Sequence, residues 1–134
     1  MITLKTLEKA TAQEVFDQVC KHMLAQRKKS VRNIRGAAVE FVDSEEQNGS
    51  CAYRGYRGLK CAAGCLIADD EYSEKMELNG WHELVADGLV PEAHKELIRE
   101  LQKIHDFELA HNWALELEGL AERLDFELTY DTNN

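Results

Sequence analysis

Apolar residues recur at helical spacing near the start of the chain. The segment Thr11 to Glu14, with the sequence TAQE, has the spacing of a capping box, in which each side chain bonds the backbone N–H of the other residue. Behind it the apolar positions form one stripe, made of Val15, Phe16, Val19, Cys20, Met23 and Leu24. The pattern predicts a helix from Thr11 to about Lys29.

The second half of the chain repeats this period in three segments. Their boundaries are indicated by residues that favour helix ends: Asn at an N-cap, Gly just past a C-terminus and Pro at a first helical position. We predict a short helix over 81–85 between Asn79 and Gly88, a second from Pro91 to His105, and a third from Ala110 to Leu124.

Other segments lack the helical period and are typical of extended structure. We predict short strands at Ile2–Leu7 and Gly36–Val42, a polar loop over 43–50 with a turn at Asn48 and Gly49, a hairpin-like segment at Cys51–Leu66, and an edge strand through Phe126, Leu128 and Tyr130. The expected fold class is therefore α+β and mainly α. It has about four helices with a small antiparallel sheet or hairpin in the middle of the chain, in a single globular domain over 1–134.

Charge is unevenly distributed along the chain, whose net charge is −9. Between Lys21 and Lys60, nine lysines and arginines stand against four acidic residues, whereas from Asp69 onward five stand against eighteen. Such a dipole either closes on itself in the fold or offers two faces to partners of opposite sign.

The apolar runs and the first residues bear on where the protein acts. No apolar run approaches the roughly 18 residues of a membrane span, and the start MITLKTLEKA lacks the features of a secretion signal. We expect a soluble, cytoplasmic protein with no membrane partner. Its four cysteines are then expected to be thiols or metal ligands rather than disulfides.

Three of the four cysteines lie in the stretch from Cys51 to Asp70. The run CAAGC at Cys61–Cys65 consists of small residues, which allow close backbone approach, and we predict that it is buried against the first helix. The spacing of Cys51, Cys61 and Cys65 differs from the paired C-x2-C pattern of zinc modules. We therefore predict buried thiols without metal or cofactor; if zinc is present, these three are its ligands.

The histidines are predicted to be packed rather than catalytic. His94 and His105 are separated by about 16 Å of helical rise, too far to share one ion. His105 and Asp106 are adjacent in a predicted helix, so their side chains are not expected to face each other. No catalytic residue is predicted.

Aromatic and basic residues alternate around a glycine-rich turn in the middle of the chain: Tyr53, Arg54, Tyr56, Arg57 and Lys60. Such a set can stack a base and hold a phosphate, so a nucleotide or single-stranded nucleic acid is one candidate ligand. The alternative is structural, with Arg54 and Arg57 paired to carboxylates of the acidic half.

A run of acidic residues follows, at Asp69, Asp70, Glu71, Glu74 and Glu77. Together with the carboxylates of the later helices, this acidic surface could imitate the phosphates of a DNA duplex and occupy a DNA-binding protein. The alternatives are a generic protein-binding surface and ordinary solvated helix faces.

The stretch CAYRGYRGLKCAAGCLIADDEY, with ATAQEVFDQV upstream and GLVPEAH and LIRELQKIHD downstream, resembles a family of small bacteriophage and prophage proteins with no established activity. The resemblance implies a protein made in the cytoplasm of an infected bacterium. It also implies a phage-type accessory protein that binds a host protein without catalysis, as an inhibitor of host machinery or defence. A homo-oligomer is compatible with this prediction.

Overall fold

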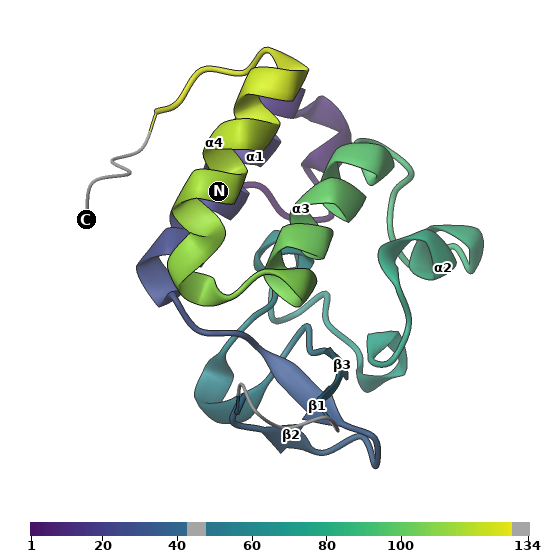
Figure 1. Cartoon of the computed structure of the whole chain (residues 1–134). Helices are drawn as coiled ribbons and strands as arrows, with labels where there is room; N and C mark the ends of the chain where they lie inside the picture. Colours follow the sequence, from purple (N-terminus) through teal and green to yellow (C-terminus); the bar gives the residue numbers. More distant parts are fainter. Residues whose placement is uncertain (43–47, 130–134) are drawn as a thin grey trace.

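The computed structural model describes residues 1–42 and 48–129 (Figure 1). In this part of the chain there are four α-helices: α1 (Ala12–Gln26), α2 (Trp81–Ala86), α3 (Lys95–Phe107) and α4 (Trp113–Leu124). Helices α1, α3 and α4 pack together at one end of the molecule, a small sheet lies at the other, and the short α2 stands beside α3. The predicted fold class, α+β and mainly α, is confirmed.

The sheet has three antiparallel strands in the order β2-β1-β3, namely β1 (Val31–Asn33), β2 (Ala38–Val39) and β3 (Asn48–Cys51). Only part of the predicted strand at Gly36–Val42 is a strand. The polar loop predicted over 43–50 is wrong for 48–50, where the turn signal is overridden by pairing with β1. The rest of that loop, 43–47, lies outside the described residues.

The predicted hairpin at Cys51–Leu66 does not form as two strands. The chain does fold back on itself, because Cys61 N–H donates to the Ala52 carbonyl at 3.1 Å. The returning segment instead consists of the 3-10 turns η2 (Tyr56–Gly58) and η3 (Ala63–Leu66). The Ser30 hydroxyl lies within hydrogen-bond distance of the carbonyls of Ala52 and Leu59, one on each side of the turn. These two carbonyls therefore bond a side chain rather than an opposite strand.

The strands predicted at the two ends of the chain are also wrong. Ile2–Leu7 forms a turn that leads into the 3-10 turn η1 (Leu7–Lys9), and the Ile2 backbone is bonded at both polar groups by the Gln18 side chain. At the other end, Gln13 bonds both backbone polar groups of Glu127. In both places a side-chain amide, rather than a neighbouring strand, satisfies the backbone N–H and carbonyl groups. Tyr130, the last residue of the predicted edge strand, lies outside the described residues.

Helix ends follow the predicted signals in part. Thr11 and Glu14 form the capping box of α1, and Gly88, with φ of 73°, ends α2. Helix α1 stops at Gln26, because Arg27 takes a left-handed conformation with φ of 52°. Helix α3 begins four residues after Pro91, because His94 is also left-handed, with φ of 63°.

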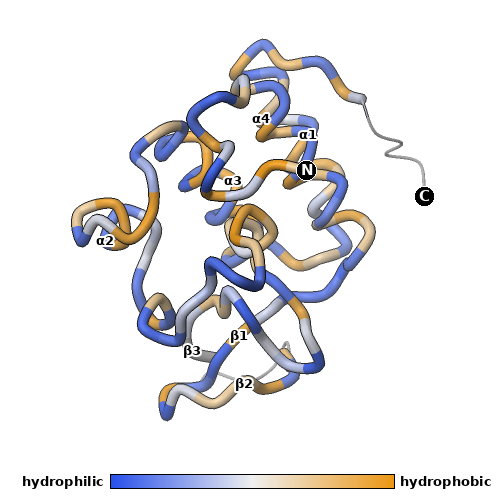
Figure 2. The backbone as a smooth tube through the Cα atoms, turned by 180° about the vertical axis from the view of Figure 1, so that it is seen from behind, coloured by the Kyte–Doolittle hydropathy of each residue, from blue (hydrophilic) through white to orange (hydrophobic). Residues whose placement is uncertain are grey.

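The core lies between α1, α3, α4 and the small-residue turn η3. Along the helices in Figure 2, hydrophobic and hydrophilic residues alternate, as expected for helices buried on one face. Ala62, Ala63 and Gly64 are buried where η3 contacts α1 and α3, so the prediction for CAAGC is confirmed. None of the described helices is long and apolar enough to cross a bilayer.

Candidate functional site

The side chain of Arg54, the second residue of the predicted Tyr/Arg site, is bonded to several groups of the protein itself. Its guanidinium donates to the carbonyls of Tyr53 and Gly64 at 3.0 Å each, and also to the carbonyl of Ile67. It forms an ion pair with Asp69 at 3.1 Å, as the structural alternative predicted. With these partners, Arg54 has little capacity left for a ligand phosphate.

Tyr53 is buried next to a buried carboxylate, that of Glu77. The Tyr53 hydroxyl donates to the Asn79 carbonyl at 2.7 Å, and its backbone N–H donates to Glu77 at 3.0 Å. Glu77 also accepts from the hydroxyl of Tyr72 at 2.6 Å and lies 3.4 Å from Arg32. Burial raises the pKa of the Tyr72 hydroxyl, and the bond to Glu77 adds to this shift. The assignment of Glu77 to an acidic surface is therefore wrong.

Of the other three residues of the predicted site, Tyr56 and Arg57 lie in η2, and Lys60 lies beside the C-terminal half of α1. Arg57 is exposed, and its guanidinium lies 5.3 Å from the centre of the Tyr56 ring. No carboxylate among the described residues pairs with Arg57, contrary to the structural alternative. The backbone of Lys60 is tied to α1, because the Gln26 side chain bonds both its N–H and its carbonyl.

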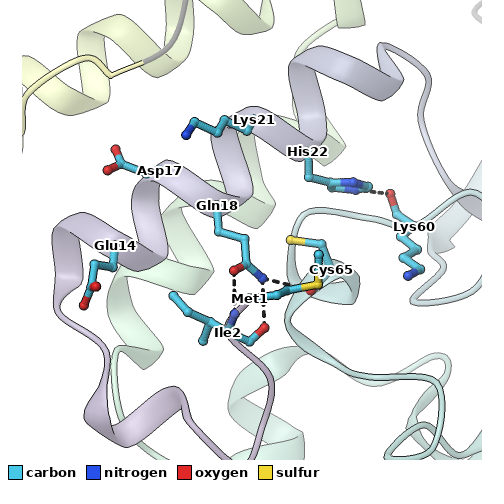
Figure 3. A pocket seen from close by; sticks show the side chains of 9 residues that line it. All are labelled: Met1, Ile2, Glu14, Asp17, Gln18, Lys21, His22, Lys60 and Cys65. Carbon is cyan, nitrogen blue, oxygen red and sulfur yellow. Dashed lines mark hydrogen bonds between the residues drawn. The ribbon is translucent and has the colours of Figure 1, made fainter.

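A surface pocket of about 630 Å³ lies between α1, η3 and the first residues of the chain (Figure 3). Gln18 crosses it and donates to the carbonyls of Ile2 and Cys65. His22 lies 3.0 Å from the Lys60 carbonyl. Burial lowers the pKa of His22 and raises that of Cys65 to about 12, so both side chains are neutral near pH 7. The sequence patterns did not indicate this pocket.

The cysteines are placed as thiols in or near the core. Cys51 and Cys61 are hydrogen-bonded to each other, which raises the pKa of Cys51, and burial adds to that shift. The Cys65 thiol instead contacts the Ala62 carbonyl at 3.3 Å. Within residues 1–42 and 48–129, no three His, Cys, Asp or Glu side chains are arranged to hold a metal ion.

His105 and Asp106 do interact, which corrects the expectation that their side chains point apart. His105 Nδ1 lies 2.8 Å from the Asp106 carboxylate, because both side chains turn toward each other in the last turn of α3. His105 Nε2 accepts the backbone N–H of Ser30 at 3.1 Å, and the ring stacks on Trp113. Nε2 therefore links α3 to the residue before β1, whereas Nδ1 is engaged within α3 itself.

The predicted acidic surface is divided by the fold. Asp69, Asp70 and Glu74 are exposed, whereas Glu77 is buried. Glu71 accepts three backbone N–H groups, two of them from the first residues of the chain. Burial opposes ionisation of Glu71, yet these three bonds outweigh it and lower the pKa of its carboxyl group. Imitation of a DNA duplex remains a prediction, with fewer exposed carboxylates in this run than the sequence indicates.

A groove of about 600 Å³ lies between the sheet, the start of α2 and the end of α3. Apolar residues from separate segments line it: Val31, Phe41, Leu78, Trp81 and Phe107. Phe107 is 80% exposed and Leu78 57% exposed. The indole N–H of Trp81 is buried and has no acceptor among the described residues. The sequence did not indicate this groove, because its residues are far apart along the chain and follow no single period.

Comparison with known proteins gave no relatives. No family model, no curated protein and no solved structure matches the chain. The resemblance to small phage proteins therefore stays a prediction from the motif.

Proposed function

We propose that this protein acts by binding a partner protein, without catalysis, through the apolar groove between the sheet, α2 and α3. The observation that carries the proposal is the exposure of Phe107 (80%) and Leu78 (57%) around a groove also lined by Trp81. Large aromatic side chains beside a concave apolar surface are typical of the residues that dominate protein–protein binding energy. The resemblance implies that the partner is a host protein in the cytoplasm of an infected bacterium.

Polar groups around the groove support a protein partner. Lys29 donates to the Asp106 carbonyl at 3.0 Å, and its ammonium lies 4.7 Å from the centre of the Phe41 ring. Glu83 and Gln102 also line the groove. An apolar centre with polar groups at its edge is the usual anatomy of an interface.

The state of the titratable side chains supports binding rather than catalysis. His105 has both ring nitrogens engaged, and the free thiols of Cys51 and Cys61 are hydrogen-bonded to each other. The Cys65 thiol, with a pKa of about 12, is protonated at neutral pH and is a weak nucleophile. Nucleophilic catalysis needs an ionisable nucleophile next to an available base, and these side chains do not provide that pair.

The test combines affinity capture with a binding titration. Capture from a bacterial lysate supplies candidate partners, and the decisive measurement is the Kd of a purified candidate for wild-type, Phe107→Ala and Leu115→Ala proteins. Leu115 is a matched control, because it is 70% exposed on α4 and does not line the groove. A central aromatic contributes about 2 kcal/mol or more, so we expect Phe107→Ala to raise Kd at least ~30-fold.

The control decides between the groove and other surfaces. We expect Leu115→Ala to leave Kd unchanged and both variants to melt like the wild type, since both side chains are exposed. Equal affinity of the two variants for the partner would show that the groove is not the binding site.

A further inference from the structure

The fold gathers basic side chains from two segments onto one surface. One segment is the C-terminal part of α1 and the residues that follow it, and the other is the loop around η2. Their backbones are joined where Gln26 bonds the N–H and carbonyl of Lys60, at 3.1 and 2.8 Å. We call this the cationic surface: Lys21, Arg27, Lys28 and Lys60 line its hollows, and the exposed Arg57 belongs to it as part of the η2 loop, three residues before Lys60.

Two hollows bring four of these residues together. Lys21 and Lys60 line the same pocket, with His22 between them (Figure 3). Arg27 and Lys28 line a second hollow together with Leu59, the residue before Lys60. The cationic surface therefore extends from one hollow to the other across the end of α1.

Most of this positive charge is not neutralised by the described part of the chain. No described carboxylate lies within ion-pair distance of Lys28, Arg57 or Lys60, nor of Lys21. Some basic residues elsewhere are paired, namely Arg32 with Glu74, Arg54 with Asp69, Lys95 with Glu92 and Lys103 with Glu100.

Three carboxylates line the same two hollows, none of them in an ion pair with Lys21, Lys28 or Lys60. Glu14 accepts the Thr11 N–H in the capping box, and Asp17 accepts from Gln13. Glu40 lines the hollow beside Arg27 and is exposed.

We infer that the cationic surface binds the backbone of single-stranded nucleic acid, with Tyr56 as a stacking platform for a base. Tyr56 is half-buried in the same loop, and the Arg57 guanidinium lies 5.3 Å from its ring centre. Aromatic rings among lysines and arginines are the usual means of holding an unpaired strand. The hollow beside Arg27 adjoins the groove, because Lys29 and Phe41 line both, but none of the five basic residues of the cationic surface lines the groove.

A single strand fits this surface better than a duplex or an acidic protein. A duplex would bring a broad, dense array of phosphates against a chain whose net charge is −9. An acidic protein would meet the charges but would make no use of the ring of Tyr56. A base must be unstacked from its neighbours before it can lie flat on an aromatic side chain, which excludes the paired bases of a duplex.

The test uses the full chain and a fluorescein-labelled 20-nucleotide oligo-dT, with affinity measured by anisotropy from 50 to 200 mM NaCl. We expect affinity to fall with salt, with a log–log slope of about −0.7 for each phosphate contact. Arg57→Glu and Lys60→Glu should each weaken binding at least tenfold at 50 mM NaCl and make the slope shallower. Lys75→Glu is the matched control, because it makes the same charge change at an exposed lysine outside the cationic surface.

Stacking is tested separately. Tyr56→Ala should weaken binding by about tenfold, whereas Tyr56→Phe, which keeps the ring, should bind like the wild type. Thermal melts of all variants identify any that are unfolded. The inference is wrong if the oligonucleotide does not bind at 50 mM NaCl, or if Lys75→Glu weakens binding as much as Arg57→Glu. It is also wrong if polyglutamate of equal charge displaces the strand as well as unlabelled oligo-dT does, because the surface would then be a general anion site.

Discussion

Arg54 and Arg57 are three residues apart and have different surroundings. The side chain of Arg54 is only 16% exposed, because the chain returns past it at Gly64 and Ile67 and presents two backbone carbonyls to its guanidinium. A planar group with five N–H donors is well suited to bond several carbonyls at once. Arg57 lies in the 3-10 turn η2 with φ of 53° and points to solvent. The same residue type is therefore structural at one position and available for binding at the other.

These environments predict different stabilities for the two alanine variants. Arg54→Ala should lower the free energy of unfolding by about 2 to 4 kcal/mol, because buried carbonyls lose their donors. The pair with Asp69 adds little, since that carboxylate is 88% exposed. Arg57→Ala should change stability by less than about 0.5 kcal/mol. Urea melts of both variants test this, and equal losses would contradict the separate roles.

At the scale of elements, η3 serves as a spacer of small residues between α1 and α3. Ala63 donates its backbone N–H to Gln102 on α3, and Cys65 accepts from Gln18 on α1, so both helices are bonded to this turn. Gly64 allows the closest approach. A Cβ atom added there would lie 2.6 Å from the Tyr53 carbonyl oxygen, a distance that side chains do not tolerate.

We therefore predict opposite effects for two glycine-to-alanine substitutions. Gly64→Ala should lower the free energy of unfolding by about 1 to 3 kcal/mol, because backbone rather than a flexible side chain must move. Gly119→Ala should raise it by about 0.5 to 1 kcal/mol, because Gly119 lies within α4 and a Cβ there meets nothing within 4 Å. Thermal and chemical denaturation of both variants measure this. A stabilised Gly64→Ala variant would rule out the close packing.

At the scale of the whole molecule, only some of the basic residues in the first half of the chain pair with acidic residues of the second half. Arg32 and Arg54, from the basic half, pair with carboxylates of the acidic half. The first residues of the chain are attached in a similar way, because Glu71 accepts the N–H groups of Leu4 and Lys5. The cationic surface stays positively charged, and the outer faces of the later helices stay negatively charged.

The attachment by Glu71 predicts a pH dependence of stability. Its folded pKa is lowered, so the carboxylate contributes stability above its unfolded pKa of roughly 4.3 and loses it as pH falls through the folded value. The difference in unfolding free energy between wild type and Glu71→Gln should therefore be present at pH 6 and shrink toward pH 3. Asp70→Asn, at an exposed neighbour, is the control and should show little difference at either pH. A difference for Glu71→Gln that stays constant with pH would contradict this role.

Local patterns in the sequence determined most of the helices. The stripe from Val15 to Leu24, the capping box at Thr11 and the glycine at Gly88 act within a few residues of one another, so their effects are readable along the chain. The small-residue run at Cys61–Cys65 indicated close packing for the same reason, because lack of side-chain volume is a local property.

Long-range pairing was decided only by the tertiary structure. Strand β3 exists because β1, more than ten residues earlier, supplies its hydrogen-bond partners, and that partner overrides a local turn signal. The groove beside Phe107 and the burial of Arg54 and Glu77 likewise depend on segments that meet only after folding. Tyr56, Arg57 and Lys60 could be grouped from the sequence because they share one loop, but the attachment of Lys60 to α1 could not be predicted. The physical reason is that burial and ion pairing depend on distances in space, which residue order along the chain does not specify.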